Sequence, residues 1–285
     1  IKWPFSINKI IQAKVPSPMH QQIDFLIMGS SGQIGSAFVR QIEKDGRSWI
    51  PIRVRLNNHD AIRSIIKEVH PQVSVIIAAG CGTRPNTKWC EDHHLETIDM
   101  NVTSQLAIAK ICKEEEVFCT LIGTAGFYHT TDTNLSFTET STPNNVQTYY
   151  YKMRVELENL LSETGLNKST LNLRALFPMD SKASKSGLLG KLITFNKVFS
   201  IPTSMTILDT LVPLAIQMME DRTTGNVNWV CEGTQTNGDV LRSYKEIVDP
   251  SIEFDEEFLT NEQSIQSMNS AAHIIPDVMR RKHMS

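Results

Sequence analysis

The chain has 285 residues and a near balance of charge, with 28 Lys and Arg against 31 Asp and Glu. This length suffices for one large α/β domain, or for a main domain with a smaller lobe, without disulfide or metal staples. The charged residues form no long stretch of one sign, so the composition argues against a nucleic-acid partner.

The cysteines and the N-terminal segment indicate the compartment. The five cysteines form neither a CxxC pair nor a zinc-ligand spacing, and their odd number argues against a complete disulfide framework. Residues 1–22, which we expect to be a leader, carry polar residues and prolines among the apolar ones, unlike a signal peptide or a membrane span. The sequence therefore predicts a soluble, cytoplasmic protein with no membrane partner.

Short apolar runs alternate with segments of helical periodicity from residue 23 onward. The runs lack the polar alternation of half-exposed strands, as expected for parallel strands that helices cover on both faces. We expect strands near 23–28, 49–54, 73–79, 117–123 and 169–175, with helices between them near 32–44, 60–69, 101–115 and 152–163. Asp60 is the expected N-cap of the second helix.

This order predicts an α/β fold with a Rossmann-like, doubly wound parallel sheet over residues 23–178. After Pro178 the pattern loosens, although an apolar helix near 209–220 and a strand near 225–231 follow. We expect residues 179–285 to form a smaller substrate-binding lobe, partly interleaved with the sheet.

The segment "GSSGQIG" joins the first strand to the first helix. Gly29, Gly32 and Gly35 form a GxxGxxG pattern, in which a tight turn brings backbone N–H groups and a helix N-terminus to a pyrophosphate. A glycine-serine loop also ends strands for ordinary reasons, but its place in a βα series favours dinucleotide binding. The remaining expected contacts on this loop are Ser31, Gln33 and Ile34.

The end of the second strand predicts which dinucleotide binds. An acidic residue there favours NAD, whereas a basic residue suits the 2′-phosphate of NADP. Arg53 and Arg55 occupy this region, and no acidic residue follows before Asp60. We therefore predict NADP(H), with Arg55 as the 2′-phosphate partner and Ala79 as a further cofactor contact. The alternative is that each arginine is an exposed charge at a strand end.

Several motifs together resemble the extended short-chain dehydrogenase/reductase family, in its dTDP-4-dehydrorhamnose reductase branch. They are "FLIMGSSGQIG", "RLNN", "GTRPNTKWCEDHHLETIDMNV", "LNLRALFPM" and "IPTSMTILD". The nearest resemblance is to the epimerase/reductases that form UDP-rhamnose from UDP-4-keto-6-deoxyglucose. It implies NADPH-dependent reduction of a nucleotide-linked 4-keto-6-deoxyhexose in rhamnose biosynthesis, and it suggests a homodimer.

The resemblance also implies a mechanism in which a tyrosine gives a proton to the alkoxide formed at C4. A nearby lysine lowers the pKa of that tyrosine, and a serine or threonine binds the ketone oxygen. Lys152 and Thr124 match these two positions. The tyrosine is expected four residues before the lysine, where this chain has Thr148 in "TYYYK", so Tyr149 is the expected substitute. Alternatively, the three tyrosines pack and Thr148 is an N-cap.

A second departure concerns epimerisation. The resemblance implies a cysteine two residues after the threonine, and this chain has Gly126 there, with Tyr128 and His129 nearby. Lys191 matches the implied lysine of the substrate lobe. Arg84 and Asn86 are expected to line the substrate pocket.

Other polar clusters carry weaker signals. Cys90, His93 and His94 lack a regular ligand frame, so we predict no metal. Asn101 either caps the next helix or bridges to the active site. Because Thr148 and Gly126 depart from the implied pattern, a non-catalytic dinucleotide-binding subunit is the alternative function.

Overall fold

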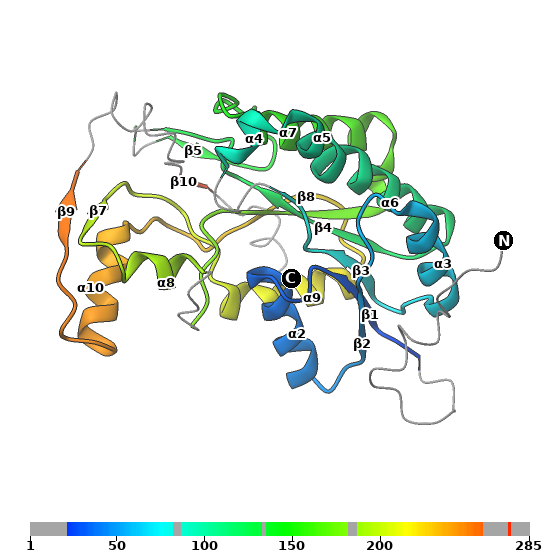
Figure 1. Cartoon of the computed structure of the whole chain (residues 1–285), viewed down its shortest axis with the longest axis horizontal. Coiled ribbons are helices and arrows are strands. Elements are labelled where there is room, and N and C mark those ends of the chain that lie inside the picture. The colour runs from blue at the N-terminus through cyan, green and yellow to red at the C-terminus, as the bar shows by residue number, and fades with distance from the viewer. Residues whose placement is uncertain are drawn as a thin grey trace.

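The computed structural model describes residues 22–81, 87–130, 132, 135–181, 187–258 and 273–274. A six-stranded parallel sheet forms its centre, with helices on both faces (Figure 1). In spatial order the strands are β2 (Trp49–Ile52), β1 (Phe25–Met28), β3 (Ser74–Ile77), β4 (Cys119–Thr124), β6 (Thr170–Ala175) and β8 (Gly225–Trp229). This topology confirms the predicted doubly wound α/β fold. The predicted leader lies outside the described residues, except for Gln22.

Two layers of helices enclose the sheet. One layer contains α2 (Gln33–Lys44) and α9 (Leu208–Glu220), and the other contains α3 (His59–Val69), α6 (Ser104–Glu114) and α7 (Tyr149–Glu163). Three short segments precede α6: α4 (Trp89–Asp92), α5 (His94–Ile98) and the π-helical turn η1 (Asp99–Thr103). A 3₁₀ turn, η2 (Leu166–Lys168), leads into β6.

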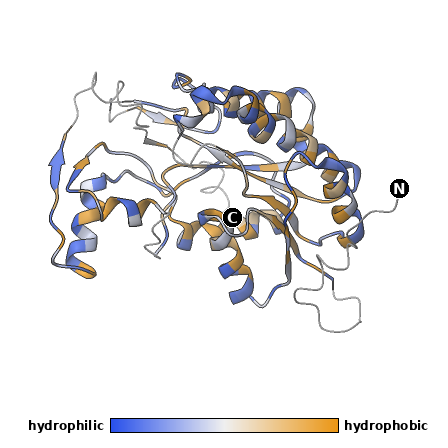
Figure 2. Cartoon of the chain, viewed as in Figure 1, coloured by the Kyte–Doolittle hydropathy of each residue, from blue (hydrophilic) through white to orange (hydrophobic). Residues whose placement is uncertain are grey.

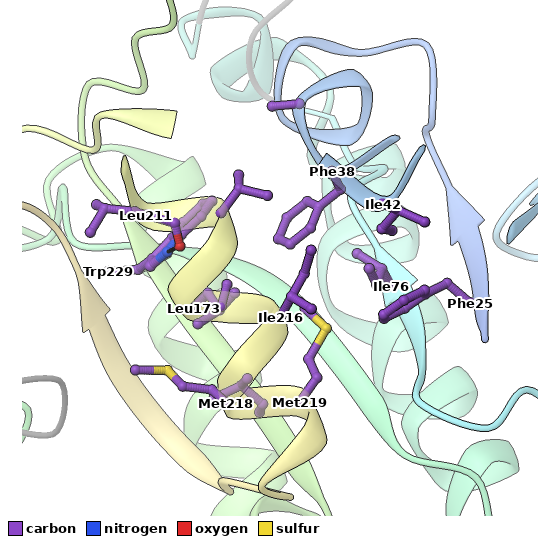
Figure 3. Packing of buried hydrophobic residues seen from close by; sticks show 14 of the residues in the cluster. Phe25, Phe38, Ile42, Ile76, Leu173, Leu211, Ile216, Met218, Met219 and Trp229 are labelled. Atoms are coloured by element: carbon purple, nitrogen blue, oxygen red, sulfur yellow. Dashed lines mark hydrogen bonds between the residues drawn. The ribbon is translucent and has the colours of Figure 1, made fainter. Parts of the chain in front are cut away.

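The core follows from the alternation of side chains along each strand. Phe25 and Ile27 of β1 face the α2 and α9 layer, whereas Leu26 and Met28 face the α3 and α6 layer, and all four are buried. Figure 3 shows the first cluster, where the side chains of α9 pack among those of α2 and the strands. This burial on both faces explains why the strand sequences are apolar throughout.

Trp229 joins the two helices of the first layer. Its ring stacks on Phe38 of α2 with 5.8 Å between centroids, and its indole N–H donates to the carbonyl of Leu211 in α9 at 2.9 Å. A buried indole is therefore fully satisfied while it fills the space between α2 and α9.

Helix α3 begins two residues earlier than a cap at Asp60 would place it. Its N-cap is Asn58, whose side chain accepts the N–H of Ala61 at 3.3 Å. Asp60 lies in the first turn, where its charge favours the helix N-terminus. The prediction of Asp60 as the cap was therefore wrong, because Asn58 caps equally well and lies closer to the turn after β2.

Further elements lie beside the carboxyl ends of the strands. They are β5 (Ser136–Phe137), α8 (Leu188–Leu192), β7 (Lys197–Phe199), α10 (Asn237–Ile247), β9 (Asp255–Glu257) and β10 (His273–Ile274). Strand β7 pairs with β9, and β5 pairs with β10. Figure 2 shows hydrophobic residues along the central strands and hydrophilic residues on the peripheral β9. The boundary at residue 178 stays a prediction, and α9 and β8 of the C-terminal part belong to the central layers.

Within the described ranges, every helix is too short or too polar to span a bilayer.

Candidate active site

The three glycines of the first loop allow a very close approach of backbone segments. Gly29 has a φ of +77°, and a Cβ atom there would lie 2.7 Å from the carbonyl oxygen of Ala78. A Cβ on Gly35 would overlap the carbonyl oxygen of Gly29 and lie 2.8 Å from its carbon. The N–H of Gly32 donates to the same oxygen at 3.0 Å. The loop is thus a tight turn that only glycine permits at positions 29 and 35.

The N-terminus of α2 lies directly after this turn. Gly32 is its N-cap and has no side chain to accept the first N–H groups, and the first turn contains no acidic residue. The N–H groups of Gln33 and Ile34 belong to this uncapped turn, where the helix dipole favours an anion. The side chain of Gln33 is bonded to the carbonyl of Pro178 at 2.9 Å, while Ser31 is exposed. These features fit a pyrophosphate site.

Two cations follow β2 at the same edge of the sheet. Arg53 and Arg55 are both exposed, and neither forms an ion pair with another described residue. A turn positions them, since the N–H of Asn58 donates to the carbonyl of Arg55 at 3.0 Å. This placement suits a phosphate on an adenosine ribose.

The loop after β3 lies against the glycine turn, at the backbone of Ala78 and Ala79. Asn101 holds this loop by accepting the N–H of Cys81 at 3.0 Å and donating to the Cys81 carbonyl at 2.7 Å. Gln105 donates to the carbonyl of Ala79 at 3.4 Å. A Cβ on Gly80 would lie 2.9 Å from the Asn101 side chain, so the loop passes close to η1 and α6. Asn101 caps neither η1 nor α6 and instead bonds to the loop after β3; whether it bridges to the active site stays a prediction.

Thr124 ends β4, beside this loop. Its side chain is buried, with 9% exposure, and its hydroxyl accepts the N–H of Gly126 at 3.1 Å. The ring of Tyr151 covers Gly126, because a Cβ on this glycine would lie 2.6 Å from the Tyr151 hydroxyl. A side chain at position 126 therefore has no space while Tyr151 is in place.

The helix that carries "TYYYK" begins at Tyr149. Thr148 is its N-cap, and its hydroxyl accepts the N–H of Tyr151 at 3.2 Å. The N–H of Tyr149 donates to the Glu91 carboxylate at 2.8 Å, and the Tyr149 ring stacks on His94 with 3.9 Å between centroids. The capping alternative for Thr148 is thus what the structure shows, and Tyr149 packs against α5. Whether Tyr149 donates a proton stays a prediction.

The predicted lysines lie on exposed surfaces. Lys152 is exposed on α7, and Lys191 is exposed on α8. The predicted substrate contacts Arg84 and Asn86 lie outside the described residues.

Tyr128 belongs to a buried polar network and not to an open pocket. Its hydroxyl donates toward the carbonyls of Thr138 and Ser141 at 3.3 and 3.0 Å, and Arg174 donates to it at 3.0 Å. Arg174 also forms a buried ion pair with Glu158 at 2.7 Å. Burial raises the pKa of Tyr128, although the charge of Arg174 opposes this shift. The residue is fully buried, which argues against a role as an acid or base toward substrate.

The two histidines after Trp89 have packing roles. His93 stacks on Trp89 with 4.0 Å between centroids and contacts its carbonyl at 2.9 Å, while His94 stacks on Tyr149. Among the described residues, no group of three His, Cys, Asp or Glu side chains is arranged to hold a metal. The sequence near Cys90 thus builds the support for the start of α7.

One buried polar side chain near the site, Arg154, was not predicted from the sequence. Arg154 is buried, with 4% exposure, and donates to Gln105 at 3.0 Å and to the carbonyl of Ile122 at 2.7 Å. Its position four residues after Tyr150 is a signal that the sequence contains. Lys152 also matches the position of the expected cation, so the sequence alone does not distinguish Arg154 from it.

Comparison with known proteins places these features in a family. The family model described as "RmlD substrate binding domain" matches residues 23–185, more than half of the chain. The chain belongs to the RmlD substrate-binding domain family. This confirms the resemblance to the dTDP-4-dehydrorhamnose reductase branch.

Two curated relatives of this RmlD-type chain come from Arabidopsis thaliana. A bifunctional dTDP-4-dehydrorhamnose 3,5-epimerase/dTDP-4-dehydrorhamnose reductase is 32% identical over 80% of this chain and 76% of its own length. A trifunctional UDP-glucose 4,6-dehydratase/UDP-4-keto-6-deoxy-D-glucose 3,5-epimerase/UDP-4-keto-L-rhamnose-reductase is 30% identical over 84% of this chain. The match spans only 36% of the trifunctional protein.

Solved structures share the fold. A UDP-rhamnose synthase from Acanthamoeba polyphaga mimivirus has a TM-score of 0.82 at 23% identity, covering 93% of this chain and 95% of that one. A dTDP-4-dehydrorhamnose reductase from Bacillus anthracis str. Ames, solved in complex with NADP, has a TM-score of 0.74 at 13% identity over 92% and 93% of the two chains. At these identities the likeness concerns the fold.

Proposed function

We propose that this RmlD-type chain is an NADPH-dependent reductase of a nucleotide-linked 4-keto-6-deoxyhexose, in the formation of UDP- or dTDP-rhamnose. The observation that carries the proposal is the glycine turn at the uncapped start of α2, combined with relatives named as reductases of such sugars. The cofactor supplies a hydride to the sugar carbonyl carbon.

The cofactor roles follow from the fit of the residues present. The glycine turn leads directly into the uncapped start of α2, where we propose that the N–H groups of Gln33 and Ile34 bind the phosphate oxygens. The two exposed guanidinium groups after β2 favour a phosphorylated ribose, and we assign the 2′-phosphate to Arg55. Ala79, Ser31 and Gly32 are the remaining proposed contacts.

Substrate roles rest on the ends of β4 and α7. Thr124 is proposed to donate its hydroxyl hydrogen bond to the ketone oxygen, where negative charge develops during reduction. A phenol at the start of α7 then gives the proton. Lys152 is proposed to bind the cofactor ribose, and Lys191, Arg84 and Asn86 to contact the substrate.

Epimerase activity has less support than reduction. The ring of Tyr151 fills the space beside Gly126, and glycine offers no acid or base there. We therefore propose reduction as the principal activity of this chain.

A second candidate function is a non-catalytic dinucleotide-binding subunit. It is favoured by one observation, the use of the Thr148 hydroxyl as a helix cap at the position where the resemblance implies a catalytic tyrosine. Such a protein would bind NADPH without consuming it.

The deciding experiment mixes the purified chain, NADPH and UDP-4-keto-6-deoxyglucose or dTDP-4-dehydrorhamnose, and follows NADPH consumption. Because some relatives also epimerise, UDP-4-keto-L-rhamnose is included as a substrate that requires reduction alone. Consumption that depends on a keto sugar supports the reductase. If the chain binds NADPH but consumes none of it with any of the three keto sugars, the result supports the binding subunit.

The oligomeric state and the cellular location of the chain are also proposals. We propose a homodimer, as the resemblance suggests, and a cytoplasmic location, as the cysteine pattern and the N-terminal segment suggest. Sedimentation velocity over a range of protein concentrations measures the oligomeric state. A mass equal to one chain at every concentration would contradict the homodimer.

A further inference from the structure

Residues 178–181, which we call the strap, follow β6 and are fastened to helix α2. The carbonyl of Pro178 accepts a side-chain N–H of Gln33 at 2.9 Å. The carboxylate of Asp180 forms an ion pair with Arg40 at 2.9 Å. The Asp180 side chain is 5% exposed, so this pair is shielded from solvent more than an ordinary surface pair. Two side chains of the helix that begins at the proposed phosphate site therefore hold the strap.

A chain of hydrogen bonds within α2 joins these two side chains. Arg40 donates to the hydroxyl of Ser36 at 3.3 Å, and that hydroxyl donates to the carbonyl of Gln33 at 3.0 Å. The N–H of Gln33 is also one of the two proposed phosphate contacts. A phosphate that orders the first turn of α2 therefore acts on the same residues that hold the strap.

The strap also belongs to the core of the peripheral elements. The backbone of Met179 donates to the carbonyl of Thr206 at 2.9 Å and accepts the N–H of Leu208 at 2.7 Å. Its side chain is buried in one cluster with residues of α8, β7 and α10 and of the segment before α9, namely Leu192, Val198, Met205 and Leu241. Helix α8 carries Lys191, a proposed substrate contact. A movement of the strap is therefore also a movement within the core that supports α8.

The backbone before the strap is strained. Phe177 has a φ of +42°, a left-handed conformation that a residue with a side chain seldom adopts. Such a conformation persists where the surrounding contacts impose it. The far end of the strap is fixed to α9, because Ser181 donates to the Asp209 carboxylate through its N–H and its hydroxyl at 2.6 and 3.1 Å. The α2 contacts thus hold the part of the strap that lies next to the strained residue.

We propose that Gln33 and Arg40 are positioning residues through which a bound dinucleotide raises the affinity of the chain for the nucleotide sugar. The inference rests on the proposed function. A phosphate at the start of α2 favours the arrangement in which Gln33 and Arg40 hold the strap. The held strap fixes α8 and its neighbours for the sugar nucleotide. Because this coupling is a free energy shared by two sites, the sugar nucleotide raises the affinity for the dinucleotide by the same factor.

The first test measures the coupling without turnover. UDP and dTDP are titrated calorimetrically into the wild-type chain, with and without saturating NADP⁺. The nucleotide that binds more tightly is expected to gain about tenfold in affinity when NADP⁺ is present, and NADP⁺ should gain the same factor in the reverse titration. Equal affinities in the two conditions, or no binding of either nucleotide, would overturn the proposal.

The second test removes the contacts between α2 and the strap. The double variant Arg40→Met with Asp180→Asn removes the ion pair without leaving a buried carboxylate unpaired, and Gln33→Leu removes the other contact while it keeps the backbone N–H. In each, the gain caused by NADP⁺ is expected to fall to about twofold or less, with unchanged nucleotide affinity in its absence. Gln33→Leu leaves the ion pair in place, so it decides the question if the double variant does not fold.

Arg47→Met is the matched control. Arg47 follows α2, pairs with Glu220 of α9 instead of the strap, and has a side-chain exposure of 32%, against 31% for Arg40. The control should keep the full gain. Urea unfolding is measured for every variant, since a purely structural defect lowers stability without changing the ratio of the two affinities. A full gain in the strap variants, or an equal loss in the control, would overturn the proposal.

Turnover separates this proposal from the reductase function. At saturating NADPH, the double variant is expected to raise KM for the keto sugar by about tenfold and to keep kcat within about threefold of the wild-type value. If the wild-type chain reduces the keto sugar and the double variant has the same KM, the proposal fails while the function stands. If the wild-type chain binds NADPH and reduces none of the keto sugars, the function fails, and the nucleotide titrations still decide whether the two sites are coupled.

Discussion

Replacing Gly35 by alanine tests whether the turn after β1 is the phosphate site. The added methyl group would overlap the carbonyl oxygen of Gly29, and it would lie 2.8 Å from the carbonyl carbon and 3.0 Å from the Cα of Ser30. All three neighbours are backbone atoms, so no side-chain rotation relieves the contact. The contact with the Gly29 oxygen is the shortest of the three, so relieving it requires a movement of roughly 1 Å or more between α2 and the turn.

This displacement has two measurable consequences. Overpacking of this kind lowers the free energy of unfolding by about 1–3 kcal/mol. Loss of one charge-assisted hydrogen bond to a phosphate costs about 1.5–3 kcal/mol, which corresponds to roughly 10- to 100-fold weaker NADPH binding. Urea unfolding measures the free energy of unfolding, and a fluorescence titration measures the affinity for NADPH.

Gly46→Ala is the matched control at the other end of α2. Gly46 has a φ of +68° and open space around it, so alanine strains the backbone by about 1–2 kcal/mol without moving the turn. It should destabilise the chain yet bind NADPH as the wild type does. Wild-type NADPH affinity in Gly35→Ala, or an equal loss of affinity in the control, would contradict a phosphate site at this turn.

Three further substitutions test the charges and the caps. Arg55→Glu should weaken NADPH binding by about tenfold or more and leave NADH binding nearly unchanged; equal losses in two fluorescence titrations would contradict the 2′-phosphate role. Arg174→Leu leaves the Glu158 carboxylate buried without its cation, so the free energy of unfolding measured in urea should fall by about 3–5 kcal/mol. The double variant Arg174→Leu with Glu158→Leu should recover part of this loss. No recovery would argue against the ion pair as the cause. Thr236→Ala removes the capping box of α10 and should cost about 0.5–2 kcal/mol. Hydrogen bonds from the Thr236 N–H, from Arg242 and from the Thr236 hydroxyl lower the pKa of Asp239 from 3.8. The stability that Asp239 contributes is therefore present above the unfolded-state pKa and is lost as the pH falls through the folded-state pKa. A destabilisation by Thr236→Ala that is the same at low and neutral pH would contradict this linkage.

Much of the central sheet was predictable because burial on both faces leaves a direct trace in the sequence. Runs such as Phe25–Met28 and Ser74–Ile77 are apolar at nearly every position, and the glycines between the first strand and helix mark a turn that other residues cannot adopt. The peripheral pairs β7–β9 and β5–β10 were not predicted. They contain two or three residues each, so no period can be read from them.

The candidate site was predictable in its backbone and less so in its side chains. The glycine turn before α2 and the place of Thr124 at the end of β4 follow from local sequence. The orientation of the three tyrosines instead depends on where α7 begins and on its contacts with α4, α5 and η1, which are distant in sequence. Thr148 as the N-cap fixes that start, and it directs Tyr150 and Arg154 to one face and Lys152 to another.

The most direct test of the central claim is NADPH consumption by the purified wild-type chain with UDP-4-keto-L-rhamnose and with dTDP-4-dehydrorhamnose, alongside a mixture lacking the sugar. We expect consumption that requires a keto sugar and yields one reduced sugar for each NADPH oxidised. Tight NADPH binding with no sugar-dependent consumption would contradict it.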